Sequence, residues 1–258
     1  MRGASRAVLL QWCACQHSSA SRSAPSRRRG SAEPHVHLVF AHGSGDVGPD
    51  AFPQQVTAFP DAEFPVLAGY GDERPTVCDV AASAQSLAMR AADADGLVGY
   101  SFGAVSAAMA VGMEPPAALV LIEPALFQLA RERPATTWLI DRLEPIYLDA
   151  SLDDETFGRR LLGALRGEDP GPLLVPEALR WSRRTRLHGA PWRHPVDAGC
   201  LAETRMLVLT GGWKDEYEEV AAALVELGAE HEVLAGHEHR VVDHPACSDR
   251  IRDFVGAA

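Results

Sequence analysis

Ser101 stands in a pentapeptide that can turn a serine hydroxyl into a nucleophile. The segment Gly99-Tyr100-Ser101-Phe102-Gly103 fits the pattern G-x-S-x-G, in which a strand turns sharply into a helix and exposes the middle side chain. Gly99 and Gly103 suit this geometry because strand and helix cross there almost in contact, which leaves no room for a Cβ atom. Unpaired N–H groups and the dipole at the helix start favour developing negative charge. The pattern predicts acyl transfer at Ser101, with a serine in an ordinary tight turn as the alternative.

A serine hydroxyl needs a base to take its proton, so a histidine must lie close to Ser101. In an open parallel sheet the reactive edge lies at the carboxyl ends of the strands. Of the 10 histidines, only His42, His237 and His239 come within a few residues after a predicted strand. His42 is not available as the base if its own loop binds the oxyanion. His237 and His239 therefore remain as candidate bases, and spacing alone does not separate them.

Residues 42–46, His-Gly-Ser-Gly-Asp, form a glycine-rich segment after the first predicted strand and are called the His42 loop below. Such a loop can bind phosphate, but this one lacks the Lys-Ser/Thr pair of a Walker motif and the ribose-binding acid of a dinucleotide site. Its other use is to present backbone N–H groups to an oxyanion. We therefore expect no nucleotide and no other cofactor.

Short apolar segments alternate with segments of helical periodicity on both sides of Ser101. This order predicts an α/β fold with a mostly parallel, doubly wound sheet of about six strands. The predicted strands are residues 35–41, 64–70, 96–100, 117–124, 205–212 and 231–236, and the predicted helices are 50–57, 75–94, the segment after Ser101, 216–228 and 247–255.

Between residues 125 and 202 the alternation stops. Three segments look helical, and a Pro/Gly-rich stretch with Trp181 and Trp192 follows. The span is too long for an ordinary loop in a compact domain. We expect an inserted helical cap at residues 125–202, with the core formed by residues 34–124 and 203–258; the helical segments of the cap are 126–133, 136–150 and 154–167.

The order of His42-Gly43 loop, GYSFG turn, cap, LVLTGG strand and late histidine resembles the α/β-hydrolase fold family over residues 35–258. The segment GHEHRVVDHP resembles the late-histidine loop G-x-G-H-R-V-x-D-H-P of bacterial members. That register makes His239 the expected base, with Glu238 at a position where glycine is usual. The resemblance also implies that the backbone N–H groups of Ser44 and Phe102 form the oxyanion hole.

Two carboxylates compete to orient the histidine. Asp215 has the G-x-x-D spacing of the usual family position after the LVLTGG strand, but a helix is predicted to begin at Glu216. Asp215 can therefore also be read as a helix N-terminal acid that the dipole stabilises. Glu123 ends the strand that follows Ser101, and some family members take their acid from there. These observations slightly favour Glu123 as the acid that orients the histidine, and both candidates remain open.

Residues 1–33 differ from the rest of the chain, since they contain six arginines, a single acid and no strand or helix period. We expect a disordered basic tail, with a transit peptide as the alternative. Family members usually have two strands before the strand that ends at His42. The core is therefore expected to lack its first hairpin.

Composition excludes several classes of function. The net charge of −11 disfavours nucleic acid and anionic membranes as partners. No apolar run approaches the length of about 20 residues that spans a bilayer. The 5 cysteines are scattered without a CxxC pair, so neither a metal site nor a disulfide framework is expected. Reduced thiols favour a cytoplasmic location.

Together these residues predict a serine hydrolase that acts on a carboxylic ester or a related acyl substrate through an acyl-serine intermediate. Thioesters and carbon–carbon bonds beside a carbonyl also fit, and the apolar cap favours a small, largely hydrophobic substrate. One alternative is a non-hydrolytic enzyme of the same fold, of perhydrolase or lyase type. Another is a catalytically inactive small-molecule-binding module.

Overall fold

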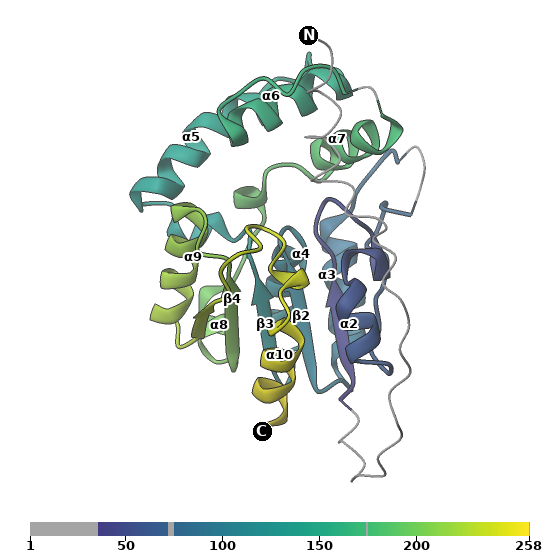
Figure 1. Cartoon of the computed structure of the whole chain (residues 1–258), viewed down its shortest axis with the longest axis vertical. Helices are drawn as coiled ribbons and strands as arrows, with labels where there is room; N and C mark the ends of the chain where they lie inside the picture. Colours follow the sequence, from purple (N-terminus) through teal and green to yellow (C-terminus); the bar gives the residue numbers. More distant parts are fainter. Residues whose placement is uncertain (1–35, 72–74, 174, 258) are drawn as a thin grey trace.

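The computed structural model describes residues 36–71, 75–173 and 175–257, and five strands of this part form one parallel sheet (Figure 1). The strands are neighbours in the order in which they occur in the chain. The expected disordered tail at residues 1–33 lies outside the described residues. The strands are β1 (Leu38–Ala41), β2 (Gly96–Tyr100), β3 (Leu119–Ile122), β4 (Met206–Thr210) and β5 (Glu230–Val233).

Helices cover both faces of the sheet, as the predicted α/β alternation requires. The first four strands are fully buried and apolar, which is typical of parallel strands packed on two sides. On one face, α3 (Val80–Ala91), α4 (Gly103–Val111) and α9 (Asp215–Glu226) share a core with alternate strand residues. On the other face, α10 (Cys247–Gly256) packs with the segment around α2 (Pro53–Ala58), which follows the 3-10 helix η1 (Gly48–Ala51).

The sheet has one strand fewer than the six predicted, because residues 64–70 do not form a strand. Their neighbour Glu63 makes a single parallel bridge to Val39 beside β1. Pro65 has no backbone N–H, so it cannot donate a hydrogen bond to a sheet. Leu67 directs its N–H to the ring of His42 instead. This segment therefore supports the His42 loop and does not extend the sheet.

The segment between β3 and β4 is helical, and α5, α6 and α7 lie together at the end of the sheet opposite the C-terminus (Figure 1). In the stretch predicted only as Pro/Gly-rich, Pro176 starts α7 and Gly189, with a φ of 76°, ends it. Proline in the first turn and glycine after the last turn are ordinary helix ends. The helices here are η2 (Phe127–Ala130), α5 (Pro134–Leu148), α6 (Asp154–Arg166), α7 (Pro176–His188), η3 (Pro191–Arg193) and α8 (Ala198–Ala202).

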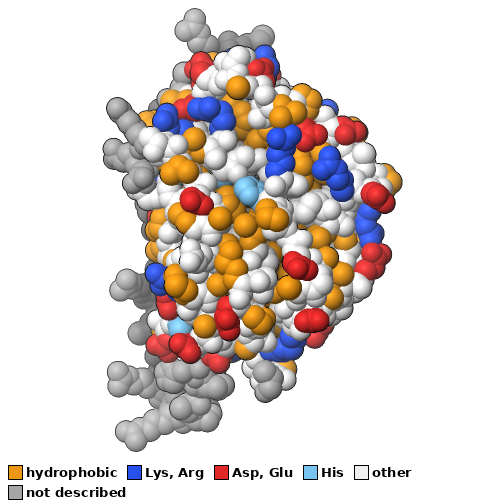
Figure 2. Space-filling model, turned by 180° about the vertical axis from the view of Figure 1, so that it is seen from behind, with side chains coloured by type: hydrophobic (Ala, Val, Ile, Leu, Met, Phe, Trp, Pro, Cys, Tyr) orange, Lys and Arg blue, Asp and Glu red, His pale blue; other side chains and the backbone are white. Residues whose placement is uncertain are grey.

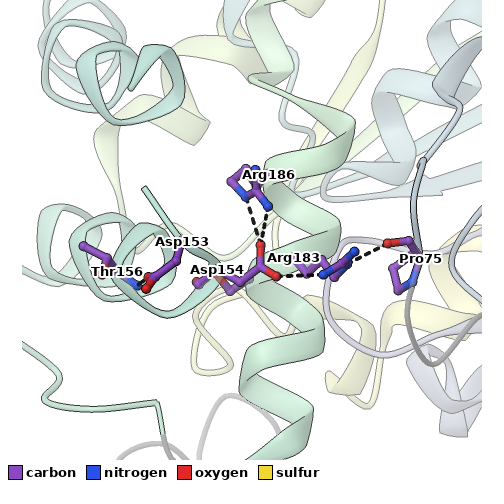
Figure 3. A network of polar contacts seen from close by, with 7 residues as sticks. Pro75, Asp153, Asp154, Thr156, Arg183 and Arg186 are labelled. Atoms are coloured by element: carbon purple, nitrogen blue, oxygen red, sulfur yellow. Dashed lines mark hydrogen bonds and ion pairs between the residues drawn. The ribbon is translucent and has the colours of Figure 1, made fainter. Parts of the chain in front are cut away.

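A charged cluster fastens α7 to its surroundings (Figure 3). Asp154, the first residue of α6, accepts hydrogen bonds from Arg183 at 3.1 Å and from Nη2 of Arg186 at 2.6 Å. Arg183 also donates through Nε to the carbonyl of Pro75, at 2.6 Å. Because Pro75 belongs to the loop before α3, this cluster joins α7 both to α6 and to the sheet-bearing part of the protein.

The surface mixes charged and apolar side chains. On the face opposite to that of Figure 1, arginine and lysine side chains are most frequent in the upper half, where the cap helices lie, whereas acidic side chains are spread over the whole face (Figure 2). In the part of the chain that the structure describes, no helix is both long enough and apolar enough to cross a membrane.

Candidate active site

Ser101 lies in a sharp turn between β2 and α4. Its φ is +54°, in the left-handed region that non-glycine residues rarely adopt, and such strain is characteristic of functional turns. Its N–H donates to the carbonyl of Ile122 at 2.9 Å, and its own carbonyl accepts from Ala125 at 3.1 Å. The end of β3 therefore holds this strained turn in place.

The two glycines of the pentapeptide permit close contacts on different sides. A Cβ atom on Gly99 would lie 2.7 Å from Cα of Ala104, so this glycine lets β2 pass close to α4. A Cβ atom on Gly103 would lie 2.2 Å from the carbonyl oxygen of Ala41 and 2.4 Å from that of His42. Gly103 thus brings the turn against the end of β1, a contact that the simple strand–helix crossing did not predict.

Ser101, His239 and Glu123 form a chain of hydrogen-bonding distances. Nε2 of His239 lies 3.0 Å from Oγ of Ser101, and Nδ1 lies 3.1 Å from Oε2 of Glu123. An ionised carboxylate only accepts, so this arrangement assigns the proton to Nδ1. Nε2 is then left with a lone pair directed at the serine hydroxyl, which is the geometry that a general base requires.

Glu123 is fully buried, with an exposed fraction of 0%. A buried carboxylate is costly unless donors surround it. Its Oε1 accepts from the backbone N–H of Gly211 at 2.6 Å, and its Oε2 accepts from Nε1 of Trp213 at 2.8 Å. Together with His239, these donors compensate both oxygens and hold the carboxylate in one orientation.

Aromatic rings surround His239. The ring centroids of Tyr100, Tyr217 and Trp213 lie 5.4, 5.2 and 6.0 Å from that of the imidazole. The hydroxyl of Tyr100 donates to the carbonyl of His239 at 3.1 Å. Packing of this kind limits the rotamers of the imidazole and excludes water from its faces.

The His42 loop reaches the nucleophile through Gly43, where a Cβ atom would lie 3.0 Å from Cβ of Ser101. His42 itself is buried. Its Nδ1 donates to the carbonyl of Gly43 at 2.7 Å, and its Nε2 accepts from the N–H of Leu67 at 3.1 Å. Burial lowers the pKa of His42 to about 4, so the ring is neutral and acts as a brace for the loop.

Ser44 and Phe102, the residues expected to supply the oxyanion hole, both line the cavity that contains Ser101. Phe102 is the N-cap residue of α4, so its N–H lies at the helix end where donors have no partner within the helix.

Arg240 connects the loop that carries His239 to the His42 loop. It donates to Asp243 through Nε at 2.8 Å and through Nη2 at 3.0 Å, and to Asp46 of the His42 loop through Nη1 at 3.1 Å. A bidentate guanidinium–carboxylate pair fixes direction as well as distance. Arg240 therefore couples the position of His239 to that of the His42 loop.

The two remaining candidates from the sequence, Asp215 and His237, are not part of this chain of hydrogen bonds. Asp215 is exposed as the first residue of α9, where its charge favours the positive end of the helix dipole. His237 lines the cavity and packs edge-on against His244, with ring centroids 5.2 Å apart. Neither residue has a place in the hydrogen-bonded chain that the structure builds from the serine, the late histidine and the glutamate.

A cavity of about 710 Å³ lies between the carboxyl ends of the strands and the cap. Ser101 and His239 form part of its floor, and helices α5, α6 and α7 supply much of its wall. Its apolar lining residues are Ala125, Phe127, Leu139, Leu143, Leu161, Leu162, Leu165, Pro191 and Trp192, among others, and the charged residues Arg166, Glu168, Lys214, Glu216, Glu238, Arg240 and Asp243 also line it. Within the described ranges, no cluster of three or more His, Cys, Asp or Glu side chains could hold a metal ion.

Sequence reasoning missed two groups of residues at this site. Trp213, which donates to Glu123, lies inside the G-x-x-D segment that was used only to consider Asp215. Trp181, Thr185 and His188 line the cavity from α7, whose helical character was not predicted. Their spacing of four and three residues is the signal that could have placed them on one helix face.

Comparison with known proteins agrees with this architecture. The model of a family described as the Alpha/beta hydrolase family matches residues 38–246. No curated protein matches the chain. Among solved structures, the chain is similar to an alpha/beta hydrolase from Sphaerobacter thermophilus DSM 20745, with 17% identity and a TM-score of 0.62 over 85% of this chain and 92% of that chain.

Two further solved structures share the fold. A pyrethroid hydrolase from Sphingobium faniae JZ-2 is 20% identical, with a TM-score of 0.56 over 86% of this chain and 98% of that chain. The NocB thioesterase domain, in a covalent complex with a fluorophosphonate nocardicin G analog, is 19% identical, with a TM-score of 0.56 over 87% and 96% of the two chains. At these identities the likeness concerns the fold.

Proposed function

Because the chain belongs to the alpha/beta hydrolase family, we propose that it is a serine hydrolase that cleaves a carboxylic ester or related acyl bond through an acyl-serine intermediate. The observation that carries the proposal is the hydrogen-bonded chain from Ser101 through His239 to the buried Glu123, with distances of 3.0 and 3.1 Å. A serine that only stabilised a turn would need neither an oriented imidazole nor a buried carboxylate behind it.

In the first half-reaction, Nε2 of His239 takes the proton of Ser101 while Oγ attacks the carbonyl carbon. The N–H groups of Ser44 and Phe102 stabilise the oxyanion of the tetrahedral intermediate. Glu123 stabilises the imidazolium and holds its tautomer. His239 then gives the proton to the leaving alcohol or thiol, which leaves an acyl group on Oγ.

In the second half-reaction, His239 takes a proton from a water molecule that attacks the acyl-serine. The second tetrahedral intermediate collapses, the carboxylic acid leaves and the proton returns to Ser101. The sum is the addition of one water across the acyl bond, with no change of oxidation state. The apolar side chains that the cap contributes to the cavity favour an acyl substrate of small or medium size with substantial hydrophobic character.

Labelling with a fluorophosphonate probe tests this function directly. The related NocB thioesterase domain forms a covalent complex with a compound of this class. We expect the intact protein to be labelled on the peptide that contains Ser101, with labelling lost in Ser101→Ala and strongly slowed in His239→Ala. Ser106→Ala is the matched control, since Ser106 is buried in the same helix α4 and does not line the cavity.

Hydrolysis of 4-nitrophenyl esters of different chain lengths, measured on the same variants, supplies the turnover that labelling does not show. Labelling of Ser101 together with ester hydrolysis supports the proposal. Labelling without hydrolysis would favour a non-hydrolytic acyl transfer. An intact protein that is neither labelled nor active would contradict the proposal and favour a binding module.

A further inference from the structure

Three polar side chains of α7 line the cavity, and each has one atom without a hydrogen-bond partner among the residues that the structure describes. They are Trp181, Thr185 and His188, whose exposed fractions are 7%, 3% and 4%. The atoms concerned are Nε1 of the indole, Oγ1 of the threonine and Nε2 of the imidazole. A buried polar atom without a partner is costly, so three of them on residues that line one cavity point to a ligand that supplies the partners.

The three side chains share one face of α7, and contacts on another face of the helix hold that face towards the cavity. Residues four and three positions apart lie on the same face of a helix, so the three side chains form a single stripe. Arg183 and Arg186, on another face, are held by Asp154 as Figure 3 shows. Rotating the stripe away from the cavity would break this charged cluster.

His188 fixes the near end of the stripe beside the nucleophile. Its ring stacks on the ring of Phe102, the residue after Ser101, with centroids 3.6 Å apart. Its Nδ1 donates to the carbonyl of Gly189 at 2.7 Å, so Nε2 is a bare acceptor. Burial lowers the pKa of His188 to about 3, which keeps the imidazole neutral at ordinary pH.

The stripe has a defined donor and acceptor pattern. The indole N–H of Trp181 only donates, Nε2 of His188 only accepts, and the hydroxyl of Thr185 can do both. A carboxylate on the substrate could accept from Trp181 but could not donate to His188. An ammonium group could donate to His188 but could not accept from Trp181. A hydroxyl group can act as donor or as acceptor, so it fits each position of the stripe, and it carries no charge among the leucine side chains of the cap.

Building on the serine hydrolase function proposed above, we propose that the α7 stripe selects acyl substrates that carry a hydroxyl group at a distance from the scissile carbonyl. With a rise of 1.5 Å per residue, Thr185 lies about 4.5 Å and Trp181 about 10.5 Å along the helix from His188. The hydroxyl is therefore several carbon atoms away from the reacting centre. Leu139, Leu143 and Leu161 line the same cavity and contact the hydrocarbon chain between the two groups.

Matched substrates test the proposal. The first series is 4-nitrophenyl octanoate and its 6-, 7- and 8-hydroxy derivatives, together with the methyl ether of the preferred derivative. The second is octyl acetate and its 8-hydroxy derivative, which places the hydroxyl in the alcohol part. We expect at least one hydroxylated ester to exceed its plain counterpart about tenfold in kcat/KM, because the plain ester leaves buried polar atoms unpaired. The methyl ether, which cannot donate a hydrogen bond to Thr185 or His188, should lose most of this preference.

Isosteric variants link the preference to the stripe. Thr185→Val and Trp181→Phe should each reduce the hydroxyl-to-plain ratio of kcat/KM severalfold. Thr136→Val is the control, since Thr136 is equally buried in α5 and does not line the cavity. Thermal unfolding of each variant verifies that it is folded.

The outcomes separate the two proposals. A folded enzyme that is labelled by fluorophosphonate and hydrolyses plain esters, but shows no hydroxyl preference in either series, would overturn the role of the stripe alone. So would a preference that Thr185→Val and Trp181→Phe both leave intact, because ordered water would then be the partner of these atoms. A protein without labelling or turnover of any ester would overturn both proposals together.

Discussion

Oε2 of Glu123 lies 3.1 Å from Nδ1 of His239, although 116 positions separate the two residues in the chain. Glu123 directly follows β3, the strand beside the one that carries Ser101, and His239 follows β5. The carboxylate thus approaches the imidazole from the neighbouring strand end. Asp215 remains exposed at the start of α9, on the surface of the protein.

This arrangement predicts different effects for the two candidate acids. Glu123→Gln should lower kcat/KM for an ester at least about 10³-fold, because the amide no longer holds the imidazole in the productive tautomer. Asp215→Asn is the matched control and should stay within about twofold of the unsubstituted protein. Steady-state kinetics on a 4-nitrophenyl ester measure both. A loss in Asp215→Asn equal to that in Glu123→Gln would refute the assignment.

Gly211 should not tolerate a side chain. A Cβ atom there would lie 2.2 Å from the carbonyl oxygen of Glu238, and the N–H of Gly211 donates to Glu123. Gly211→Ala must therefore displace the residue before His239 or the carboxylate, and a misplacement of about 1 Å can cost about 100-fold in rate. We expect kcat to fall at least tenfold.

The control for this substitution is Gly112→Ala at the end of α4, where the nearest atom to a new Cβ lies at an ordinary 3.6 Å. It should keep both kcat and the melting temperature. A Gly211→Ala variant with unchanged kcat would show that the loop of His239 moves without consequence for the reaction.

Arg240→Lys tests the connection between the His239 and His42 loops. A lysine keeps the charge but cannot make the two parallel hydrogen bonds to Asp243 while also reaching Asp46. We expect kcat/KM to fall about tenfold and the free energy of unfolding to fall by about 1 kcal/mol, since the pair is partly exposed to solvent. Arg180→Lys, which affects the surface pair with Glu177, should change neither quantity.

Acid should destabilise the fold through His42. Burial lowers its pKa from 6.5 to about 4, so between these values the unfolded chain binds a proton that the folded chain does not. The free energy of unfolding therefore falls as the pH drops from 6.5 to 4, by up to about 3 kcal/mol from this group. Urea unfolding at pH 7 and pH 4.5 measures the effect.

His42→Asn should be less stable at pH 7 and should lose less stability on acidification than the unsubstituted protein. His188, whose pKa burial lowers to about 3, remains in this variant and retains part of the pH dependence. Parallel pH dependences in the two proteins would show that His42 is not the group that titrates.

The fold class followed from local patterns. The apolar strand segments, the periodic helices and the turn around Ser101 predicted a parallel α/β sheet, and the family match over residues 38–246 confirms the fold family. The strand predicted at residues 64–70 was wrong, because the prediction followed the apolar composition and gave too little weight to Pro65, which has no N–H to donate to a sheet. Helix α7 was not predicted because its sequence is rich in arginine and most of the residues on its buried side are polar.

The sequence by itself determined the turn at Ser101 and a short set of candidate partners, because backbone conformation and periodicity depend on neighbouring residues. Only the tertiary structure decided that Glu123, with Gly211 and Trp213 as donors, lies behind His239 while Asp215 stays on the surface. It also decided that the polar stripe of α7 faces the cavity. Both outcomes depend on how segments that are distant in the sequence pack together. Small shifts in atomic position decide whether a hydrogen bond of about 3 Å forms, and no local sequence pattern encodes such shifts.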